Sequence, residues 1–315
     1  MKELVKCGSC GKRDAVFVRS YSGEKLCKQC FLESVENRVR ATIAEYGMLE
    51  FDDRILVAVS GGKDSVGLLH VLAKIEKRFP KASLFAVSID EGIKGYRNEA
   101  LKIAAENCEL LGVRHSVLSF EGLFGVSLDE LMRKAEPSKV ERLSACAYCG
   151  VLRRRALDLA AKELEADVLA LGHNLDDVVQ TFLLNIVHGD VWRLGRFGAV
   201  SSESGGRFVR RVRPFCLVPE KETAFYAYLK KIKFQTVACP YAGEALRNDA
   251  RYWLTRLEQR HAGSLFTLVR SFEKIGEAMQ HEEKVFGVCR RCGEPCAEAE
   301  NVCMVCKFLE ELGIV

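Results

Sequence analysis

The sequence predicts an α/β protein: a doubly wound parallel sheet with a small cysteine-rich knuckle at each end of the chain. Three observations support this prediction. Short apolar runs alternate with segments of helical periodicity between residues 55 and 187, which is typical of a parallel sheet with helices on both faces. A glycine turn at residues 60–65 joins the first apolar run to a helical segment. Cysteine pairs lie near both ends of the chain.

The central region is expected to contain four strands and five helices. The strands are short, apolar and rich in β-branched residues, and the helices carry apolar residues at intervals of three and four. In chain order the elements are a helix at 31–46, a strand at 55–59, a helix from 66, a strand at 83–90, a helix at 96–111, a strand at 113–118, a helix at 148–164, a strand at 167–172 and a helix at 175–187.

The remaining segments surround this sheet. Residues 189–207, which hold Gly, Ser and Arg, are expected to form a long loop. Further helices are expected at 220–231, 248–260 and 265–280. We therefore expect four units, which are a knuckle at 1–34, a central catalytic domain at 35–218, a helical extension at 219–284 and a second knuckle at 285–315.

Composition and charge narrow the class of protein. The 315 residues are 48% apolar and 29% charged, as in globular proteins that dissolve in water. No apolar run approaches the ~20 residues of a membrane span, and the first residues lack the apolar core of a secretory signal. We therefore expect a cytoplasmic protein with no membrane partner.

The net charge of +4 is small, but its placement is informative. Residues 188–213 hold six arginines against two acidic residues, an excess that equals that of the whole chain. Such a cluster suits a phosphate backbone. A solvated loop is the plain alternative.

The segment Ser60-Gly61-Gly62-Lys63-Asp64-Ser65 follows an apolar strand and precedes a helix. A helix N-terminus presents unpaired N–H groups and the positive end of the helix dipole, both of which favour a phosphate. Gly61 and Gly62 can take positive φ and let a phosphate approach the main chain, while Lys63 adds a charge. The order of residues differs from the G-x-x-x-x-G-K-[ST] loop. It matches SGGxDS and resembles the pyrophosphate loop of ATP pyrophosphatases.

Polar residues also follow two other predicted strands. Asp90 ends the second strand, and the run Gly-His-Asn-Leu-Asp-Asp at 172–177 ends the fourth. Because ligands of parallel sheets bind beyond the carboxyl ends of the strands, these residues are candidates for the same site as Ser60. The acidic residues are either helix caps or groups that hold Mg²⁺ and handle protons, and one residue can do both.

Eight cysteines form two groups with the spacing of structural zinc sites. The first group is C-x2-C-x16-C-x2-C and the second is C-x2-C-x10-C-x2-C; their members are Cys7, Cys10, Cys27 and Cys30, and Cys289, Cys292, Cys303 and Cys306. Four thiolates make a closed tetrahedral site. Because segments of about 30 residues rarely fold alone without metal, we interpret both as zinc-stabilised staples. Contact with RNA or a second subunit is the alternative role, and Cys296 is an alternative ligand.

Three further cysteines indicate a different kind of site. Cys146 and Cys149 form a C-x2-C pair with no second pair beside it, and Cys239 is the next candidate along the chain. Three ligands leave a metal or an iron–sulfur cluster with an open coordination position. The alternatives are a redox pair that carries sulfur as a persulfide and a pair that only packs. Cys108 and Cys216 have apolar neighbours and are expected in the core.

Taken in order, these motifs resemble a known family. The residues are SGGKDS at 60–65, Asp90-Glu91-Gly92-Ile93, Cys146-Ala147-Tyr148-Cys149-Gly150, Gly172-His173-Asn174, Arg213-Pro214-Phe215 and Cys239-Pro240-Tyr241. This ordered set is similar to that of tRNA 2-thiouridine synthetases of the TtuA type and of the cytosolic thiouridylase catalytic subunits. The resemblance covers essentially the full chain, including both knuckles.

The resemblance implies an ATP-dependent tRNA-uridine 2-sulfurtransferase of the PP-loop fold. ATP with Mg²⁺ would be attacked at its α-phosphorus by the uridine C2 oxygen, pyrophosphate would leave, and sulfur would then displace AMP. The implied ATP ligands are Ser60, Gly61, Gly62, Lys63, Asp64, Ser65, Asp90, Gly172 and His173. A [4Fe–4S] cluster is implied on Cys146, Cys149 and Cys239, and its open iron would hold hydrosulfide from sulfide or from the thiocarboxylate of a ubiquitin-like protein.

Further roles follow from the same resemblance. Asp177 would activate or position the uridine, Arg153 would stabilise charge because an arginine hardly gives up its proton, and Lys63 would act at the phosphates. The tRNA would meet the arginine cluster at Arg193, Arg196, Arg210 and Arg211. The motifs favour the wobble uridine over the T-loop uridine, and a homodimer is expected.

Two other functions compete with this one. A PP-loop amidotransferase or lysidine-type ligase forms amide bonds and needs no thiolates, so the three-cysteine set argues against it. A zinc-knuckle RNA-binding protein with an inactive ATPase fold has no use for an intact SGGKDS.

Overall fold

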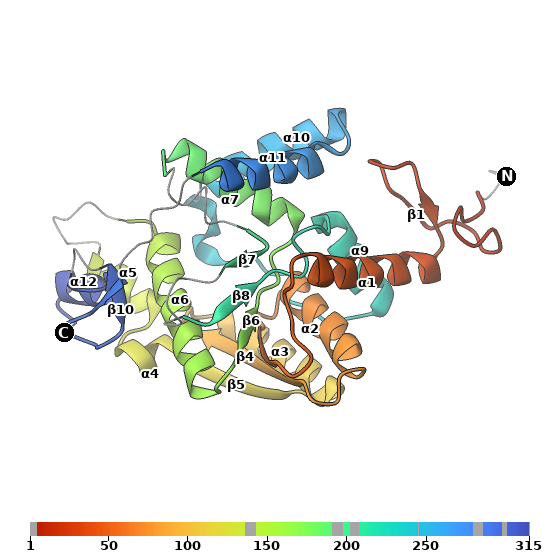
Figure 1. The fold of residues 1–315 in the computed structure, drawn as a ribbon. Helices are drawn as coiled ribbons and strands as arrows, with labels where there is room; N and C mark the ends of the chain where they lie inside the picture. The colour runs from red at the N-terminus through yellow and green to blue at the C-terminus, as the bar shows by residue number, and fades with distance from the viewer. Residues whose placement is uncertain are drawn as a thin grey trace.

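The computed structural model describes residues 5–135, 143–190, 198–201, 208–244, 246–279, 286–297 and 301–314. Its centre is a six-stranded sheet in the order β5-β4-β3-β6-β8-β7 (Figure 1). The strands are β3 (Arg54–Ala58), β4 (Ser83–Asp90), β5 (Arg114–Ser119), β6 (Val168–Ala170), β7 (Val200–Ser201) and β8 (Arg210–Val212). The chain runs outward from β3 in both directions, so the predicted doubly wound sheet is confirmed.

The sheet differs from the prediction at one edge. All neighbouring strands are parallel except β7, which pairs antiparallel with β8. The sequence analysis missed both strands, and it wrongly assigned residues 200 and 201 to a loop. Short strands that carry charged residues, such as Arg210 and Arg211, lack the apolar pattern of a strand. The rest of the predicted loop, at 191–197 and 202–207, lies outside the described residues.

Helices cover both faces of the sheet, and alternate strand residues enter two separate cores. One core packs against α1 (Lys28–Glu45), α2 (Lys63–Glu76), α3 (Arg97–Leu111), α7 (Leu175–Val187), α9 (Glu220–Lys230) and α11 (Ser264–Ala278). The other core packs against α4 (Phe120–Phe124), α5 (Leu128–Ala135), α6 (Ala145–Glu163) and α12 (Met304–Glu311). Leu56 faces this second core, while its neighbours Ile55 and Val57 face the first, as the two-residue period of a strand requires.

Helix α6 begins three residues earlier than predicted. The Ser144 side chain accepts a hydrogen bond from the Ala147 N–H at 3.3 Å and caps the helix. The first turns of α6 therefore include the Cys146–Cys149 pair. Helices α4 and α5 were not predicted, and both are short.

The two knuckles extend the two cores. In the N-terminal knuckle, β1 (Phe17–Val18) pairs with β2 (Lys25–Leu26), and the Phe17 ring stacks 5.0 Å from that of Phe225 on α9. In the C-terminal knuckle, β9 (Phe286–Val288) pairs with β10 (Pro295–Ala297), and the Phe308 ring meets Tyr148 of α6 edge-on at 4.8 Å. Cys108 and Cys216 are buried in the first core, as predicted.

The remaining elements are η1 (Pro240–Glu244) and α10 (Arg247–Arg260). Helices α10 and α11 lie side by side against α7 (Figure 1). Within the described ranges, every helix is too short or too polar to cross a bilayer.

A buried ion pair fixes α9 to the N-terminal knuckle. Glu222 of α9 accepts hydrogen bonds from Arg19 at 2.8 and 3.1 Å, and both side chains are at most 5% exposed. Arg38 and Tyr21 also donate to this carboxylate. The turn between β1 and β2 and helix α1 therefore both donate to one acceptor on α9, about 200 positions later in the chain.

We expect Glu222→Ala to lower the free energy of unfolding by about 3 kcal/mol, because it leaves the Arg19 charge buried without its main partner. Denaturant titration measures this loss. Glu24→Ala is the matched control: Glu24 also accepts from Arg19 but is 41% exposed, so its loss should stay below about 1 kcal/mol. Equal losses in the two variants would contradict this account.

Candidate active site at the carboxyl edge of the sheet

The loop at 60–65 leaves β3 where the strand order reverses, the usual ligand position in such sheets. Gly61 has φ +88°, and a Cβ there would lie 2.5 Å from the Ala100 carbonyl oxygen, so only glycine fits. Gly62 is the N-cap of α2 with φ −78°. Of the two glycines that can take positive φ, Gly61 does so, and Gly62 has the extended backbone of an N-cap.

Side chains inside and outside the loop hold its shape. The Ser65 hydroxyl accepts from the Ser60 N–H and donates to the Gly62 carbonyl, both at 3.0 Å. Gly172 touches the loop so closely that a Cβ would lie 2.9 Å from the Ser65 backbone. The first N–H groups of α2 have no acceptor within the helix. The loop is thus a preformed cradle for an anion.

Lys63 lies at this cradle between two carboxylates. Its ammonium nitrogen is 2.6 Å from Asp64 and 2.9 Å from Glu220 of α9. Burial by itself would lower the pKa of Lys63, but the two carboxylates outweigh it and raise the pKa. Lys63 therefore stays charged, and incoming phosphates would compete with carboxylates for it.

Asp177 stands at the start of α7 in a reciprocal cap with Asn174. The Asn174 side chain accepts from the Asp177 N–H at 3.0 Å, and the Asp177 carboxylate accepts from the Asn174 N–H at 3.3 Å. Burial, reinforced by the nearby Asp64, raises the pKa of Asp177 to about 6. Asp177 therefore caps the helix, and the pKa of its carboxyl group is also shifted towards neutral pH.

His173 precedes this cap and is held neutral. Burial, followed by the charges of Arg213 and Arg247, lowers its pKa to about 3. Asp90, at the end of β4, accepts from the Gly92 N–H at 2.9 Å and shapes the turn there. Both residues lie at the carboxyl edge of the sheet, as predicted.

A buried bridge joins the phosphate loop to the cysteine pair. Glu91, 3% exposed, lies 2.8 Å from Arg97 on one side and 2.8 Å from Arg153 on the other. Arg97 also donates to the Ser60 carbonyl at 2.7 Å, and Arg153 donates to the Cys149 sulfur at 3.2 Å. Glu91 belongs to one of the motifs of the sequence, but no role was predicted for it or for Arg97. Their position just after a strand end was the available signal.

A pocket opens between the loop and this bridge. Its walls are apolar on the strand side and charged on the bridge side, and its lining residues are Ala58, Val59, Ser60, Val87, Ile89, Glu91, Arg97, Arg153 and Leu157. A pocket of this composition suits a small ligand with one flat apolar part and polar edges.

The three remaining candidate cysteines belong to two segments that contact each other: Cys146 and Cys149 lie in α6, and Cys239 directly precedes η1. The Cys149 side chain is buried, Cys146 is exposed to solvent, and Cys239 is half-buried. The Cys146 sulfur lies 3.8 Å from the Tyr241 carbonyl oxygen, which brings the segment after Cys239 against α6. Burial raises the pKa of Cys149 to about 11, and the charge of Arg153 opposes that rise. Unlike the two knuckles, Cys146, Cys149 and Cys239 do not form a group whose sulfurs all lie within 4.8 Å of one another. Their place on two contacting segments, with Cys146 exposed, is nevertheless compatible with a cluster that has an open side.

Partial burial by itself would lower the pKa of Arg153, but Glu91 and Cys149 outweigh it and raise the pKa. The guanidinium is therefore a fixed positive charge beside a sulfur. This geometry agrees with charge stabilisation and not with proton transfer.

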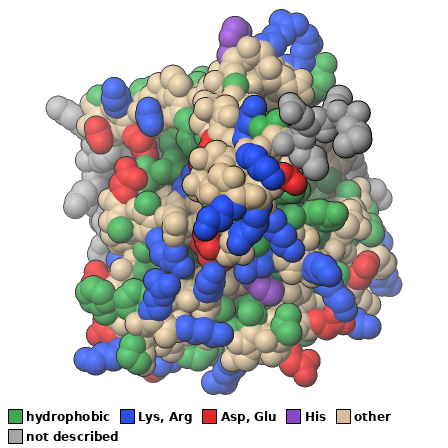
Figure 2. All heavy atoms as spheres, turned by 90° about the vertical axis from the view of Figure 1, so that its right-hand side faces the viewer, with side chains coloured by type: hydrophobic (Ala, Val, Ile, Leu, Met, Phe, Trp, Pro, Cys, Tyr) green, Lys and Arg blue, Asp and Glu red, His purple; other side chains and the backbone are tan. Residues whose placement is uncertain are grey.

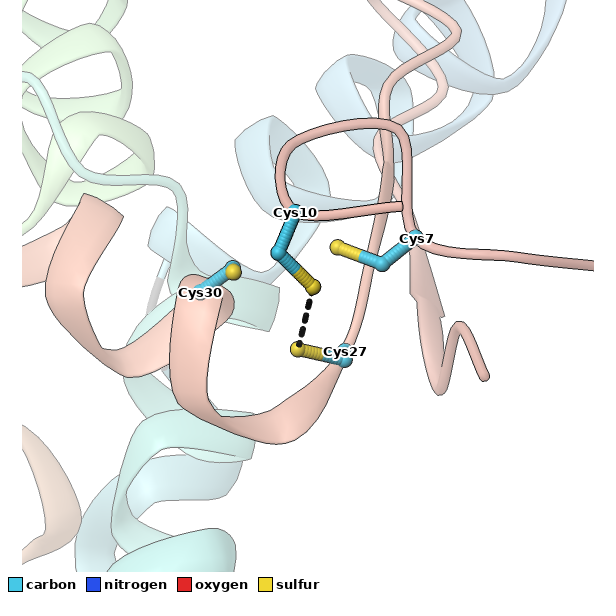
Figure 3. A group of neighbouring side chains, drawn as sticks. All are labelled: Cys7, Cys10, Cys27 and Cys30. Carbon is cyan, nitrogen blue, oxygen red and sulfur yellow. Dashed lines mark hydrogen bonds between the residues drawn. The ribbon is translucent and has the colours of Figure 1, made fainter. Parts of the chain in front are cut away.

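The two cysteine knuckles form compact four-sulfur groups. In each, the four sulfurs lie within 4.8 Å of one another, and Cys296 belongs to neither group. Figure 3 shows Cys7 and Cys10 on one loop, and Cys27 and Cys30 at the start of α1. Hydrogen bonds, chiefly from the backbone of Cys27, lower the pKa of Cys7 to about 6. Backbone hydrogen bonds also lower the pKa of Cys10, whereas burial raises the pKa of Cys30 to about 12. Four inward thiols fit a tetrahedral zinc ion.

The predicted tRNA-binding arginines have mixed surroundings. Arg193 and Arg196 lie outside the described residues. Arg210 pairs with Asp53 at 2.9 Å and Arg211 with Asp158 at 2.5 Å, so both already have acidic partners and their contact with RNA stays a prediction.

Basic side chains gather elsewhere too. Lys and Arg side chains collect at the centre of the face in Figure 2, the side towards which the N-terminal knuckle projects in Figure 1. The exposed basic residues of that knuckle are Lys6, Lys12, Arg13, Lys25 and Lys28.

Comparisons with known proteins agree with this geometry. The profile of the PP-loop domain matches residues 32–257. The tRNA 2-thiolation protein NcsA of Haloferax volcanii is 38% identical over 99% of this chain and 100% of its own length. The cytoplasmic tRNA 2-thiolation protein 1 of Laccaria bicolor is 36% identical over 97% of this chain and 85% of its own. The U34-tRNA thiolase NcsA from Methanococcus maripaludis, solved with its [4Fe-4S] cluster, superposes with a TM-score of 0.85 at 31% identity, over 100% of this chain and 98% of that one.

We expect the purified protein to hold two zinc ions per chain, one for each four-sulfur group, as measured by elemental analysis. Cys10→Ser should reduce this to one ion, because three thiolates bind zinc much less tightly than four. Cys108→Ser is the control: Cys108 is a buried core cysteine that belongs to neither four-sulfur group, so two ions should remain. Two ions retained by Cys10→Ser would refute the first site.

Proposed function

The chain belongs to the PP-loop family, and we propose that it transfers sulfur to a tRNA uridine that it first adenylates with ATP. Its relatives are named tRNA 2-thiolation proteins. One observation carries the proposal: the phosphate cradle and the three-cysteine group share one edge of the sheet, joined through Glu91. Amide-forming and purely RNA-binding functions have no use for both features.

The first step joins the uridine to AMP. The loop at 60–65 would hold the phosphates of ATP with Mg²⁺, and the pocket beside it would hold the nucleoside. The uridine C2 oxygen attacks the α-phosphorus, a P–O bond forms, and pyrophosphate leaves with the electrons of the broken P–O bond. Lys63 would neutralise charge that develops on the phosphates, and Asp177 in its ionised form would position the uridine or accept its N3 proton.

The second step replaces oxygen with sulfur. Hydrosulfide attacks C2, a C–S bond forms, the C2–O bond breaks, and AMP leaves with the former C2 oxygen. N3 regains the proton that it lost in the first step, either from hydrosulfide or from Asp177, and any remaining proton goes to solvent. No electron is gained or lost overall. A [4Fe–4S] cluster bound by Cys146, Cys149 and Cys239 would supply an iron with an open position for the incoming sulfur. Arg153, next to Cys149, would stabilise negative charge there.

Several finer points extend this proposal. We favour the wobble uridine, since the relative from Methanococcus maripaludis is named a U34-tRNA thiolase. Sulfur would arrive as sulfide or from the thiocarboxylate of a ubiquitin-like protein. We further propose two zinc ions as structural metals, a homodimer, and a cytoplasmic site of action, the last supported by the name of the Laccaria bicolor relative.

The decisive experiment incubates the anaerobically purified protein with ATP, Mg²⁺, sulfide and a tRNA transcript. AMP, pyrophosphate and 2-thiouridine should form in equal amounts, and nuclease digestion of the tRNA should place the 2-thiouridine at the wobble position. ATP that is neither bound nor cleaved under these conditions would refute the proposal.

We expect Cys239→Ala to lose at least 100-fold in 2-thiouridine formation and to lose the brown colour of the cluster, because two thiolates cannot retain it. Its tRNA affinity should stay within about twofold. Cys216→Ala, at a buried core cysteine, is the control that should keep both colour and activity. Full thiolation by Cys239→Ala would remove this residue from the cluster.

We expect the rate of pyrophosphate formation to rise about tenfold per pH unit below pH 6 and to level off above pH 7. The raised pKa of about 6 for Asp177 means that its ionised form becomes dominant in this window. Single-turnover rates between pH 5 and 8 measure the profile. Asp177→Asn should be slow and lack the inflection, whereas Asp90→Asn should keep it. An unchanged inflection in Asp177→Asn would assign the titration to another group.

A further inference from the structure

Helix α10 is held to the protein along a narrow face. Only Ala250 and Leu254 of its described side chains are buried. On the opposite side, Tyr252 is 65% exposed and Trp253 is 53% exposed. Two adjacent large aromatic side chains in water are costly unless they serve a contact.

Basic residues accompany these aromatic rings. Tyr252, Arg256 and Arg260 follow one another at intervals of four, so their side chains are neighbours on the helix surface. The Arg256 guanidinium lies 5.7 Å from the centre of the Tyr252 ring, in cation–π contact. We call Tyr252, Trp253, Arg256 and Arg260 the α10 stripe.

Negative charge is sparse along this stripe. Glu258 is directed to the start of α11, where it accepts from the N–H groups of Gly263 and Leu265 at 2.7 and 3.1 Å. Asp249 is the other acidic residue of the helix, against four arginines in all. The exposed surface of α10 is therefore basic as well as aromatic.

The N-terminal end of α10 lies next to the candidate active site. Arg247 donates to the Thr181 hydroxyl at 3.0 Å and lies 3.9 Å from the Asp177 carboxylate. Arg251 lies 3.9 Å from Glu220, the partner of Lys63. At 1.5 Å per residue, the 14 residues of α10 extend about 20 Å outward from this edge. Figure 1 shows α10 on the outside of the molecule, beside α11.

We infer that the α10 stripe is the surface on which the substrate RNA lies next to the reacting uridine. Unpaired bases stack on Tyr252 and Trp253, and Arg256 and Arg260 neutralise the neighbouring phosphates. Exposed aromatic rings interleaved with arginines are the usual platform for single-stranded RNA, because every base offers a flat face. The inference rests on the proposed function, since it locates the RNA of that same site.

The test compares tRNA affinity by fluorescence anisotropy at several KCl concentrations, with the full chain. The double variant Tyr252→Ala/Trp253→Ala should bind about 10- to 100-fold more weakly, from the loss of stacking, while its affinity for ATP stays unchanged. Arg256→Gln/Arg260→Gln should lower the slope of log affinity against log salt by about 1.5. All four side chains are on the surface, so folding should be preserved, and thermal unfolding checks this.

Matched controls come from other exposed residues. Tyr228→Ala removes a ring that is 71% exposed on α9, and Lys162→Gln removes a charge that is 79% exposed on α6; neither should change tRNA affinity by more than about twofold. Native-like affinity in both double variants would overturn the inference. The same holds if the variants turn a dimer into a monomer but bind tRNA normally, because the stripe then serves a second copy.

The two proposals fail in different ways. If the native protein binds tRNA through the stripe but forms no AMP and no 2-thiouridine, the RNA surface stands and the proposed function falls. If the native protein thiolates tRNA and the stripe variants thiolate it with unchanged KM, the function stands and the RNA surface falls.

Discussion

The site depends on one buried carboxylate. Glu91 lies between Arg97 and Arg153 and so connects the Ser60 carbonyl of the phosphate loop with the sulfur of Cys149. A buried carboxylate without partners is expensive, and each arginine needs an acceptor in turn, so the three groups hold one another in place. The distance between the nucleotide end and the sulfur end of the site is set by this triad and not by a mobile loop. A two-step reaction at one substrate atom requires that kind of fixed spacing.

Each knuckle supports one end of this arrangement from outside. The N-terminal knuckle holds α9 through Arg19 and Glu222, and α9 in turn presents Glu220 to Lys63. The C-terminal knuckle contacts α6 in two places. Its Phe308 packs on Tyr148 of α6, and its Glu294 pairs with Arg155 of α6. Because α6 also carries Cys146 and Cys149, four-sulfur groups far from the chemistry contribute to the position of the reacting groups.

The sequence predicted the parts of this fold that have a strong local signal. The strand at 83–90 and the helix at 175–187 have the bounds expected of them, since their periodicity is long and regular. Strands β7 and β8 were missed because their pairing partners, and not their own residues, make them strands. Likewise the cysteine spacing indicated the four-sulfur groups, whereas the Glu91 bridge depends on residues 62 positions apart. Local sequence patterns do not predict a contact between residues so far apart in the chain.

The way the C-terminal knuckle packs has a consequence for biogenesis. Val302, Phe308 and Leu309 are part of the same core as Leu152 and Cys149. The ribosome makes these three residues long after α6, so α6 is fully packed only once they are present. Translation proceeds from the N-terminus, and domains fold as they emerge. The nucleotide loop therefore has its partners, among them Glu220 and Gln235, before the C-terminal knuckle is made. The helix with the cysteine pair gains Phe308 and Leu309 only afterwards, so its thiols would reach their final geometry later than the phosphate cradle does.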